Sequence, residues 1–387
     1  MGRLKTTAIV LILLVPLVLT ACDDIGLLLT VIETVDPPQW EKVTDFSVGT
    51  VSDGFGYAVD ISANYAIIGS PGVDGLGSNR GAAFVYAKKD GKWDWENYQT
   101  LTAQTPADSD QFGITVAISD DYAVVRSFGA GEVEIFERTG DSWIWKQTFS
   151  AAGTFGAALD ISGDYIAVGN PTNSYVRIYE RNGTWTEDQE ITQSGNYGAA
   201  VAIHNGYLAV GNDDYDGSVA NSGRVFLYQK SVNWIQIDEL KPDKETLSGY
   251  FGRSVSLTDD DLIISERTTM RVYFYTRDKS GWVFSQTGAI ENVVVGDEFG
   301  TPVSIQGRIA VASASGTDSN RGSVYVLEKY GELWYYRGAE LSHDQPVADD
   351  YFGFSSSVWG DFIIIGAYFD DTPVGANVGS VYIFTRR

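Results

Sequence analysis

Short hydrophobic segments recur along the chain, separated by clusters of glycine, aspartate, asparagine and serine. Val59–Ile61 alternates apolar and polar positions, Ala66–Gly69 is an unbroken apolar run, and Phe84–Tyr86 ends on an aromatic residue. Alternation is typical of a half-buried strand, and an unbroken short run is typical of a strand buried on both faces. Together with a further strand opened by Trp93, the pattern predicts four consecutive strands per unit and no long helix.

A Phe-Gly or Tyr-Gly pair opens each unit and occurs seven times, at intervals of 42 to 57 residues. This interval is too long for a repeat of two helices and fits one four-stranded propeller blade. We therefore expect an all-β fold, a seven-bladed β-propeller of four-stranded antiparallel blades that forms one domain over residues 40–387. The pairs are Phe55-Gly56, Phe112-Gly113, Phe155-Gly156, Tyr197-Gly198, Phe251-Gly252, Phe299-Gly300 and Phe352-Gly353.

The two ends of the repeat array complement each other. Six tryptophans that open a fourth strand follow Phe55, so the last unit lacks its fourth strand when the chain stops at Arg387. Trp40 stands 15 residues before Phe55, a separation like those in the other units. We expect residues 40–48 to pair antiparallel with residues 379–384, which closes the ring and covers an exposed sheet edge.

The repeat resembles the FG-GAP repeat of integrin-α-like propellers. Besides the Phe-Gly pairs, second strands end in Gly69-Ser70-Pro71, Gly169-Asn170-Pro171 and Gly366-Ala367-Tyr368, which are similar to the Gly-Ala-Pro of that family. Three repeats depart from it, with Arg126, Ser265 and Ala312 assigned to the glycine position. The Asp-x-Asp-x-Asp-Gly calcium loop of many members is absent between the first two strands, so the resemblance implies a calcium-poor propeller.

The N-terminal residues predict export and lipid anchoring. Arg3 and Lys5 precede an apolar run over residues 8–19, which is too short to span a membrane comfortably and is typical of a secretory signal. Leu19-Thr20-Ala21-Cys22 resembles the lipobox of bacterial lipoproteins, which implies cleavage before Cys22 and its lipidation. We expect a signal peptide over 1–21, a tether over 22–39 and a membrane-anchored protein of the bacterial cell envelope.

The net charge of -24 disfavours nucleic acid and anionic lipid as partners. Propeller topology places second-to-third loops and fourth-to-first connections on one face, which collects aspartates and should be acidic. The opposite face should mix Asp120, Asp121 and Asp164 with lysine and arginine. The aspartates of the first face are Asp53, Asp74, Asp108, Asp110, Asp213, Asp214, Asp216, Asp297, Asp318, Asp349, Asp350, Asp370 and Asp371.

One acidic loop is a candidate for a cation. Asp213, Asp214 and Asp216 cluster the oxygen ligands that Ca²⁺ prefers, although a solvated acidic loop is the favoured explanation of the three. The four long second-to-third loops end in Asn-x-Gly, at Asn79, Asn221, Asn320 and Asn377, which indicates turns with positive φ rather than ligand sites. We expect no obligatory cofactor.

Signals for an enzyme are weak. His204 and His343 fall on opposite faces of the predicted ring and neither has a metal-ligand spacing. No hydrolase, metalloprotease or phosphate-loop motif occurs. We therefore expect a non-catalytic, monomeric binding or scaffold propeller for an envelope protein. The alternative is a carbohydrate-binding propeller, since tryptophans stack on sugars, and a hydrolase based on paired carboxylates comes after both.

Overall fold

The computed structural model describes residues 39–387 except 76, 291–292 and 345. The predicted signal segment, Cys22 and the tether before Gln39 lie outside the described residues. No helix within the described part is both long and apolar enough for a membrane span.

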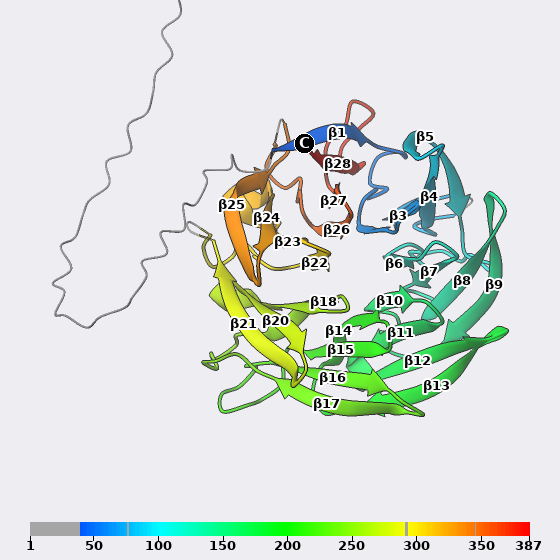
Figure 1. Cartoon of the computed structure of the whole chain (residues 1–387). Coiled ribbons are helices and arrows are strands. Elements are labelled where there is room, and N and C mark those ends of the chain that lie inside the picture. Colours follow the sequence, from blue (N-terminus) through cyan, green and yellow to red (C-terminus); the bar gives the residue numbers. More distant parts are fainter. Residues whose placement is uncertain (1–38, 76, 291–292, 345) are drawn as a thin grey trace, which may run out of the picture. The chain divides into compact units, whose positions relative to one another are not determined.

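The described chain forms seven four-stranded antiparallel sheets, which confirms the predicted fold class and blade number (Figure 1). Six of the blades use consecutive strands, and the helices are single turns, η1 (Pro171–Asn173), η2 (Arg267–Thr269) and α1 (Thr317–Asn320). Blade 1 comprises β2 (Ala58–Ile61), β3 (Tyr65–Ser70), β4 (Ala82–Lys89) and β5 (Lys92–Leu101); blade 2, β6 (Thr115–Ile118), β7 (Tyr122–Ser127), β8 (Glu132–Thr139) and β9 (Ser142–Ser150); blade 3, β10 (Leu159–Ser162), β11 (Tyr165–Asn170), β12 (Tyr175–Asn182) and β13 (Thr184–Thr192). Blade 4 comprises β14 (Tyr197–His204), β15 (Tyr207–Asn212), β16 (Arg224–Lys230) and β17 (Trp234–Leu240); blade 5, β18 (Phe251–Leu257), β19 (Asp261–Glu266), β20 (Arg271–Asp278) and β21 (Gly281–Ala289); blade 6, β22 (Val303–Gln306), β23 (Ile309–Ala314), β24 (Ser323–Tyr330) and β25 (Leu333–Leu341).

Blade 7 is built from both ends of the described chain. Its strands β26 (Ser355–Trp359), β27 (Phe362–Ala367) and β28 (Ser380–Arg386) are completed by β1 (Trp40–Phe46), in the order β1-β28-β27-β26. β1 pairs antiparallel with β28, from Trp40 opposite Arg386 to Phe46 opposite Val381. The predicted ring closure is confirmed, and Figure 1 shows β1 lying along β28 at the rim.

The core consists of layers between neighbouring blades. The second strand of each blade is almost entirely buried, as the unbroken apolar runs predicted. Between several blades a glutamine on the outer strand clamps the next tryptophan: the Gln99 side chain donates to the Trp143 carbonyl (2.7 Å) and accepts from its N–H (2.8 Å). Trp143, Trp185, Trp234, Trp282 and Trp334 are at most 7% exposed, so these rings pack the blades and are not available for stacking on sugars.

The connection that enters each first strand is held in one of two ways. In blades 1, 2, 6 and 7, a buried aspartate two residues before the Phe-Gly pair accepts the N–H of the residue three positions earlier. We call these blades the Asp arc. The bonds run to Asp53 from Thr50 (2.5 Å), to Asp110 from Ala107 (2.5 Å), to Asp297 from Val294 (2.7 Å) and to Asp350 from Val347 (2.6 Å).

Blades 3, 4 and 5, which we call the Asn/Glu arc, have Gly153, Gly195 and Gly249 in place of that aspartate. In blades 3 and 4 an asparagine at the end of the second strand, Asn170 or Asn212, bonds to the same connection instead. In blade 5 Glu266 has this place: its Oε1 lies close to Gly249, while its Oε2 accepts the Thr269 and Tyr273 hydroxyls. Asn170 accepts the Thr154 N–H (3.1 Å) and donates to the Ala152 carbonyl (2.8 Å). Asn212 donates to the Ser194 carbonyl (2.6 Å).

One sequence assignment is wrong by one residue. The glycine position of the second strand in blade 6 is Ser313 and not Ala312, because the Ser313 carbonyl accepts the Gly300 N–H (2.7 Å) as the Gly69 carbonyl accepts the Gly56 N–H (3.1 Å). Arg126 occupies the expected position, because its carbonyl accepts the equivalent bond from the Gly113 N–H (3.0 Å). Ser265 also occupies it, because its side chain lies close to Gly300 of the next blade.

Candidate binding surfaces

The structure separates two faces. We call the face of the second-to-third loops and fourth-to-first connections the loop face, and the opposite one the turn face. Not all aspartates predicted for the loop face are on its surface. Six are buried and hold the loops together, namely Asp53, Asp110, Asp213, Asp297, Asp350 and Asp370. On the turn face, arginines pair with aspartates of neighbouring turns, as in Arg138–Asp121 (2.8 Å) and Arg277–Asp260 (3.5 Å), which agrees with a mixed surface.

The three candidate cation ligands are engaged by protein donors. Asp213 accepts the Asn196 amide (2.7 Å) and pairs with Arg253 (3.1 Å). Asp214 accepts the Asn196 backbone N–H, and Asp216 accepts the Asn221 N–H (2.9 Å). In the described residues, the one group of carboxylates and histidines placed to hold a metal lies elsewhere. Calcium at this loop stays a prediction, and the Asn-x-Gly turns have positive φ at Asn79, Asn221, Asn320 and Asn377.

The loop face carries an aromatic patch where blades 7 and 1 meet, formed by Tyr57, Tyr351, Phe354, Tyr368 and Phe369. Ring centroids lie 4.3 Å apart for Phe354 and Tyr368, and 5.1 Å apart for Tyr57 and Tyr368. Phe369 is 38% exposed. Clustered, partly exposed aromatic rings are typical of protein-binding surfaces and rare elsewhere on a soluble protein.

A buried cation lies beside this patch. Arg126 is 6% exposed, and its Nε has no hydrogen-bond partner within the described residues. Its guanidinium lies 5.2 Å from the centroid of Phe128. Burial lowers the pKa of Arg126, and the nearby Tyr57 opposes that shift. Because an unpaired charge is costly to bury, this position favours an anionic group brought by a ligand.

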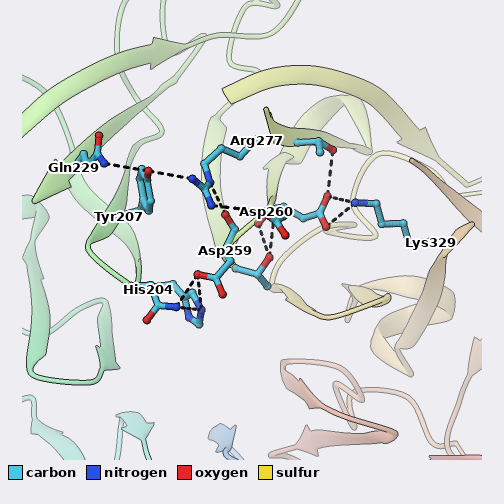
Figure 2. Close-up of polar contacts among 11 residues, drawn as sticks. His204, Tyr207, Gln229, Asp259, Asp260, Arg277 and Lys329 are labelled. Carbon is cyan, nitrogen blue, oxygen red and sulfur yellow. Dashed lines mark hydrogen bonds and ion pairs between the residues drawn. The ribbon is translucent and has the colours of Figure 1, made fainter. Parts of the chain in front are cut away.

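The turn face has a hollow of about 500 Å³ at the centre of the ring, lined by first-to-second turns of the blades. Figure 2 shows a polar network that runs from blade 4 to blade 6, of which His204, Asp259 and Asp260 also line the hollow. Arg277 donates to the Asp259 carbonyl (2.6 Å) and to the Tyr207 hydroxyl (3.2 Å), while Lys329 donates to Asp261 (2.7 Å) (Figure 2). Each charge meets an opposite charge or a polar group, which is the arrangement of a structural network.

Two aspartates of the innermost strands also line this hollow. Asp60 accepts the Ile118 N–H (2.8 Å) and the Ser357 hydroxyl (2.9 Å), and Asp160 accepts the Ile203 N–H (2.7 Å). Burial raises the pKa of Asp60 to about 6 and that of Asp160 to about 7. Because their oxygens bond to the backbone of the next blade, these carboxylates join blades and are poorly placed to transfer protons to a substrate.

The two histidines lie on opposite faces, as predicted. His204 is on the turn face, where its Nε2 lies 3.6 Å from Asp259, and His343 is in the connection between β25 and β26 on the loop face. Sequence reasoning missed the aromatic patch and the neighbours of His343. The signal available for the patch was weak: Tyr57 and Phe354 directly follow the Phe-Gly pairs of blades 1 and 7.

Comparison with known proteins agrees with this architecture. Four stretches match the FG-GAP repeat, residues 39–86, 95–135, 291–327 and 338–384. No curated protein matches the chain. The fold is similar to that of a chain in the crystal structure of the mitotic checkpoint complex, with a TM-score of 0.60, 13% identity and 99% of both chains covered.

A second similar structure is selenomethionine-substituted virginiamycin B lyase from Staphylococcus aureus, with a TM-score of 0.60, 9% identity, and 90% of this chain and 99% of that chain covered. At these identities the two structures establish likeness of fold alone. The repeat matches and the seven closed blades together show that this chain carries FG-GAP repeats on a seven-bladed β-propeller.

Proposed function

We propose that this chain is a lipid-anchored protein of the bacterial cell envelope whose propeller binds a protein partner through its loop face and catalyses no reaction. The observation that carries this proposal is the aromatic patch beside the buried Arg126, whose Nε has no hydrogen-bond partner among the described residues. Aromatic and arginine side chains dominate the binding energy of protein interfaces. A partner that places a carboxylate on Arg126 and apolar side chains on the patch would satisfy both features.

The test is capture of partners from envelope extract by a soluble form carrying Cys22→Ser. The structure offers a matched pair of exposed aromatic residues, Phe369 on the loop face (38% exposed) and Trp359 on the turn face (37% exposed). Phe369→Ser should lower recovery of a captured protein at least tenfold, whereas Trp359→Ser should leave it unchanged. Equal loss in both variants would refute the loop face as the binding surface.

Anchoring is tested separately at Cys22. The lipobox resemblance supports a thioether-linked lipid there, and lipidation with more than one chain gives stable membrane attachment. We expect the Cys22→Ala protein to be either uncleaved or soluble, and in both cases to lack the lipid mass, as detergent partitioning and the mass of the N-terminus would show. An unmodified Cys22 thiol in the wild-type protein would contradict this part of the proposal.

Carbohydrate binding is the second candidate, and one observation favours it. A groove of about 1010 Å³ beside the outer strands of blades 5 and 6 is lined by Tyr335, Tyr336, Arg321 and Glu340, among other residues. Exposed tyrosines beside charged groups can stack on and hydrogen-bond a sugar. Binding to a glycan array that Tyr336→Ala abolishes, and that Phe369→Ser leaves intact, would favour this function over a protein partner.

A further inference from the structure

We propose that blade 7 contains a binding site for a divalent transition-metal ion of the zinc class, formed by the imidazole of His343 and the carboxylates of Asp350 and Asp370. His343 and Asp350 come from the connection between β25 and β26, and Asp370 comes from the loop between β27 and β28. One ligand atom from each residue can be chosen so that all three lie within 4.8 Å of one another. This site goes beyond the proposed function and is independent of it.

The separations suit one shared ion. His343 Nε2 and Asp370 Oδ2 are 3.6 Å apart. Two ligand atoms bound to the same ion at about 2.0–2.1 Å lie roughly 3–4 Å apart, depending on the angle between the bonds. Asp350 and Asp370 are 1% and 5% exposed, so the carboxylates are already withdrawn from water. The side chain of His343 is 13% exposed, which leaves it accessible from one side.

Blade 1 shows how the same positions look without such a site. The carbonyl of Val73 accepts the Gly81 N–H (2.8 Å), as the carbonyl of Asp370 accepts the Gly379 N–H (3.1 Å), so Val73 and Asp370 are equivalent. Val48 lies two residues after Phe46, the last residue of β1, in the connection that enters blade 1. His343 lies two residues after Leu341, the last residue of β25, in the equivalent connection that enters blade 7. Val48 and Val73 pack in an apolar cluster with Phe84. Blade 7 therefore has His343, Asp370 and Tyr382 where blade 1 has only apolar side chains.

The surroundings orient the ligands and favour positive charge. The Tyr382 hydroxyl donates to Asp370 Oδ2 (2.7 Å), and the Val347 N–H donates to Asp350 Oδ2 (2.6 Å). These donors form a second layer that fixes the orientation of both carboxylates. A hollow of about 390 Å³ opens beside His343 and Asp370. Water in this hollow can complete the coordination of a three-ligand site.

The net charge of this hollow is negative. Its lining includes Asp45, Asp344 and Asp371 and a single cation, Lys42. Lys42 is already paired with Asp45 (2.7 Å) and with Asp344. A bound cation would offset the repulsion among these carboxylates. The presence of an imidazole ligand favours zinc, copper, iron or nickel over calcium, which binds oxygen ligands.

The test uses the full chain in detergent, carrying Cys22→Ser so that no thiol competes, and freed of metal by chelation. Titration calorimetry with zinc should show one equivalent bound, and zinc should raise the melting temperature. His343→Ala should weaken zinc binding at least tenfold. His204→Ala is the matched control, because His204 also lies 3.6 Å from an aspartate but on the exposed turn face and without a second buried carboxylate, and it should bind as wild type does.

A second variant separates metal binding from folding. The His343→Val and Asp370→Val double variant gives blade 7 the valines of blade 1, and it should fold and bind no zinc. Absence of stoichiometric zinc binding by the wild type, or equal binding by His343→Ala, would overturn the site. Tighter binding of calcium than of zinc would overturn the class of ion. None of these outcomes bears on the Phe369 and Trp359 comparison that tests the proposed function.

Discussion

The Asp arc and the Asn/Glu arc build the same connection from opposite sides. In blade 2, Asp110 reaches back three residues to the Ala107 N–H, whereas in blade 3, Asn170 reaches across from the end of the second strand to Thr154. The two positions change together. In the Asp arc the connection has an aspartate and the second strand ends in a small residue, such as Ser70 or Ser127. In the Asn/Glu arc the connection has a glycine and the second strand ends in Asn or Glu. The backbone polar groups of the turn need partners, and either an aspartate that accepts or an asparagine that both accepts and donates supplies them.

The matches to the FG-GAP repeat follow the same division. The four stretches that match the FG-GAP repeat contain Phe55, Phe112, Phe299 and Phe352, which are the pairs of the Asp arc. The blades of the Asn/Glu arc have the same four strands and the same closure of the ring. Blades with and without the matching sequence therefore share one backbone fold, and the matching blades are those that hold the turn with an aspartate.

The largest effect is expected at the ring closure, which lies inside the Asp arc. Replacing Trp40–Phe46 by seven glycine and serine residues removes β1 and with it Phe46, whose ring lies 5.9 Å from Phe55 and 5.1 Å from Tyr86. Phe46 is partly buried, so loss of its side chain alone should cost less than the about 3–5 kcal/mol of a fully buried aromatic side chain. We expect a melting temperature lowered by more than about 10 °C and aggregation through the free edge of β28, measured by calorimetry and size-exclusion chromatography.

The matched change in the other arc replaces β17, the outer strand of blade 4, by a linker of the same kind. This strand also has seven residues, and the chain continues on both of its sides. The β17 variant should be less damaged, because the ring stays joined through the chain at that blade. If the β1 variant melts no lower than the β17 variant, closure has no importance beyond that of one outer strand.

The next largest effect tests the two ways of holding the turn. Asp110→Ala leaves the Ala107 N–H without its side-chain acceptor, and Asn170→Ala leaves the Thr154 N–H without its acceptor and the Ala152 carbonyl without the Asn170 donor. Each variant should lose about 1–3 kcal/mol of unfolding free energy, measured by urea denaturation. If Asp110→Ala leaves the unfolding free energy unchanged while Asn170→Ala lowers it, the two arcs are not equivalent.

A smaller effect concerns the innermost ring, which does not follow the division into arcs. Asp60 lies in the Asp arc and Asp160 in the Asn/Glu arc, and burial raises the pKa of Asp60 to about 6 and that of Asp160 to about 7. A carboxyl whose pKa is raised by folding binds its proton more tightly in the folded state. Its contribution to stability is complete below the ordinary pKa of about 4 and is lost as the pH rises through the folded value.

Asp160→Ser introduces the residue that blades 5, 6 and 7 have at this position, as Ser256, Ser304 and Ser357. Relative to wild type, the variant should gain stability, on the order of 1 kcal/mol, as the pH rises from about 4 to the folded pKa of about 7, and the gain should then level off. The corresponding gain for Asp60→Ser should level off about one pH unit lower, at the folded pKa of about 6. Urea denaturation at several pH values measures both, and a difference independent of pH would contradict the assignment.

The sequence predicted features that depend on local pattern. Strand order, blade number and closure by Trp40–Phe46 follow from the Phe-Gly pairs and from the tryptophan spacing, since each is encoded within one repeat. The error at Ala312 arose because residues 309–314 alternate small and branched apolar residues, so that no glycine marks the register. Only the bond between Gly300 and Ser313 settles it.

The candidate surfaces could not be predicted in the same way, because they join residues that are distant in the sequence. Tyr57 and Tyr368 come together only because the ring closes, and His343 meets Asp370 only through the conformations of two loops. The sequence placed His343 on the correct face. It could not show that the aspartates predicted to make that face acidic would turn inward, as Asp350 and Asp370 do.

The smallest expected effect is the sharpest test of the comparison between arcs. In blade 5, Gly249 occupies the place of the arc aspartate, and its N–H donates to the Thr246 carbonyl (2.9 Å) as the Asp110 N–H donates to the Ala107 carbonyl (3.3 Å). A Cβ on Gly249 would lie 2.6 Å from Glu266 Oε1, which has no hydrogen-bond partner within the described residues.

Gly249→Asp alone should therefore cost about 1–3 kcal/mol, because two carboxylates compete for one buried place. Glu266→Ser alone should cost a similar amount, since the Tyr273 hydroxyl and Thr269 hydroxyl lose their acceptor. The double variant transfers the Asp arrangement to blade 5 and should lie within about 1 kcal/mol of wild type in urea denaturation, so the two changes should couple strongly. Additive losses would show that each arc depends on more of its surroundings than these two positions.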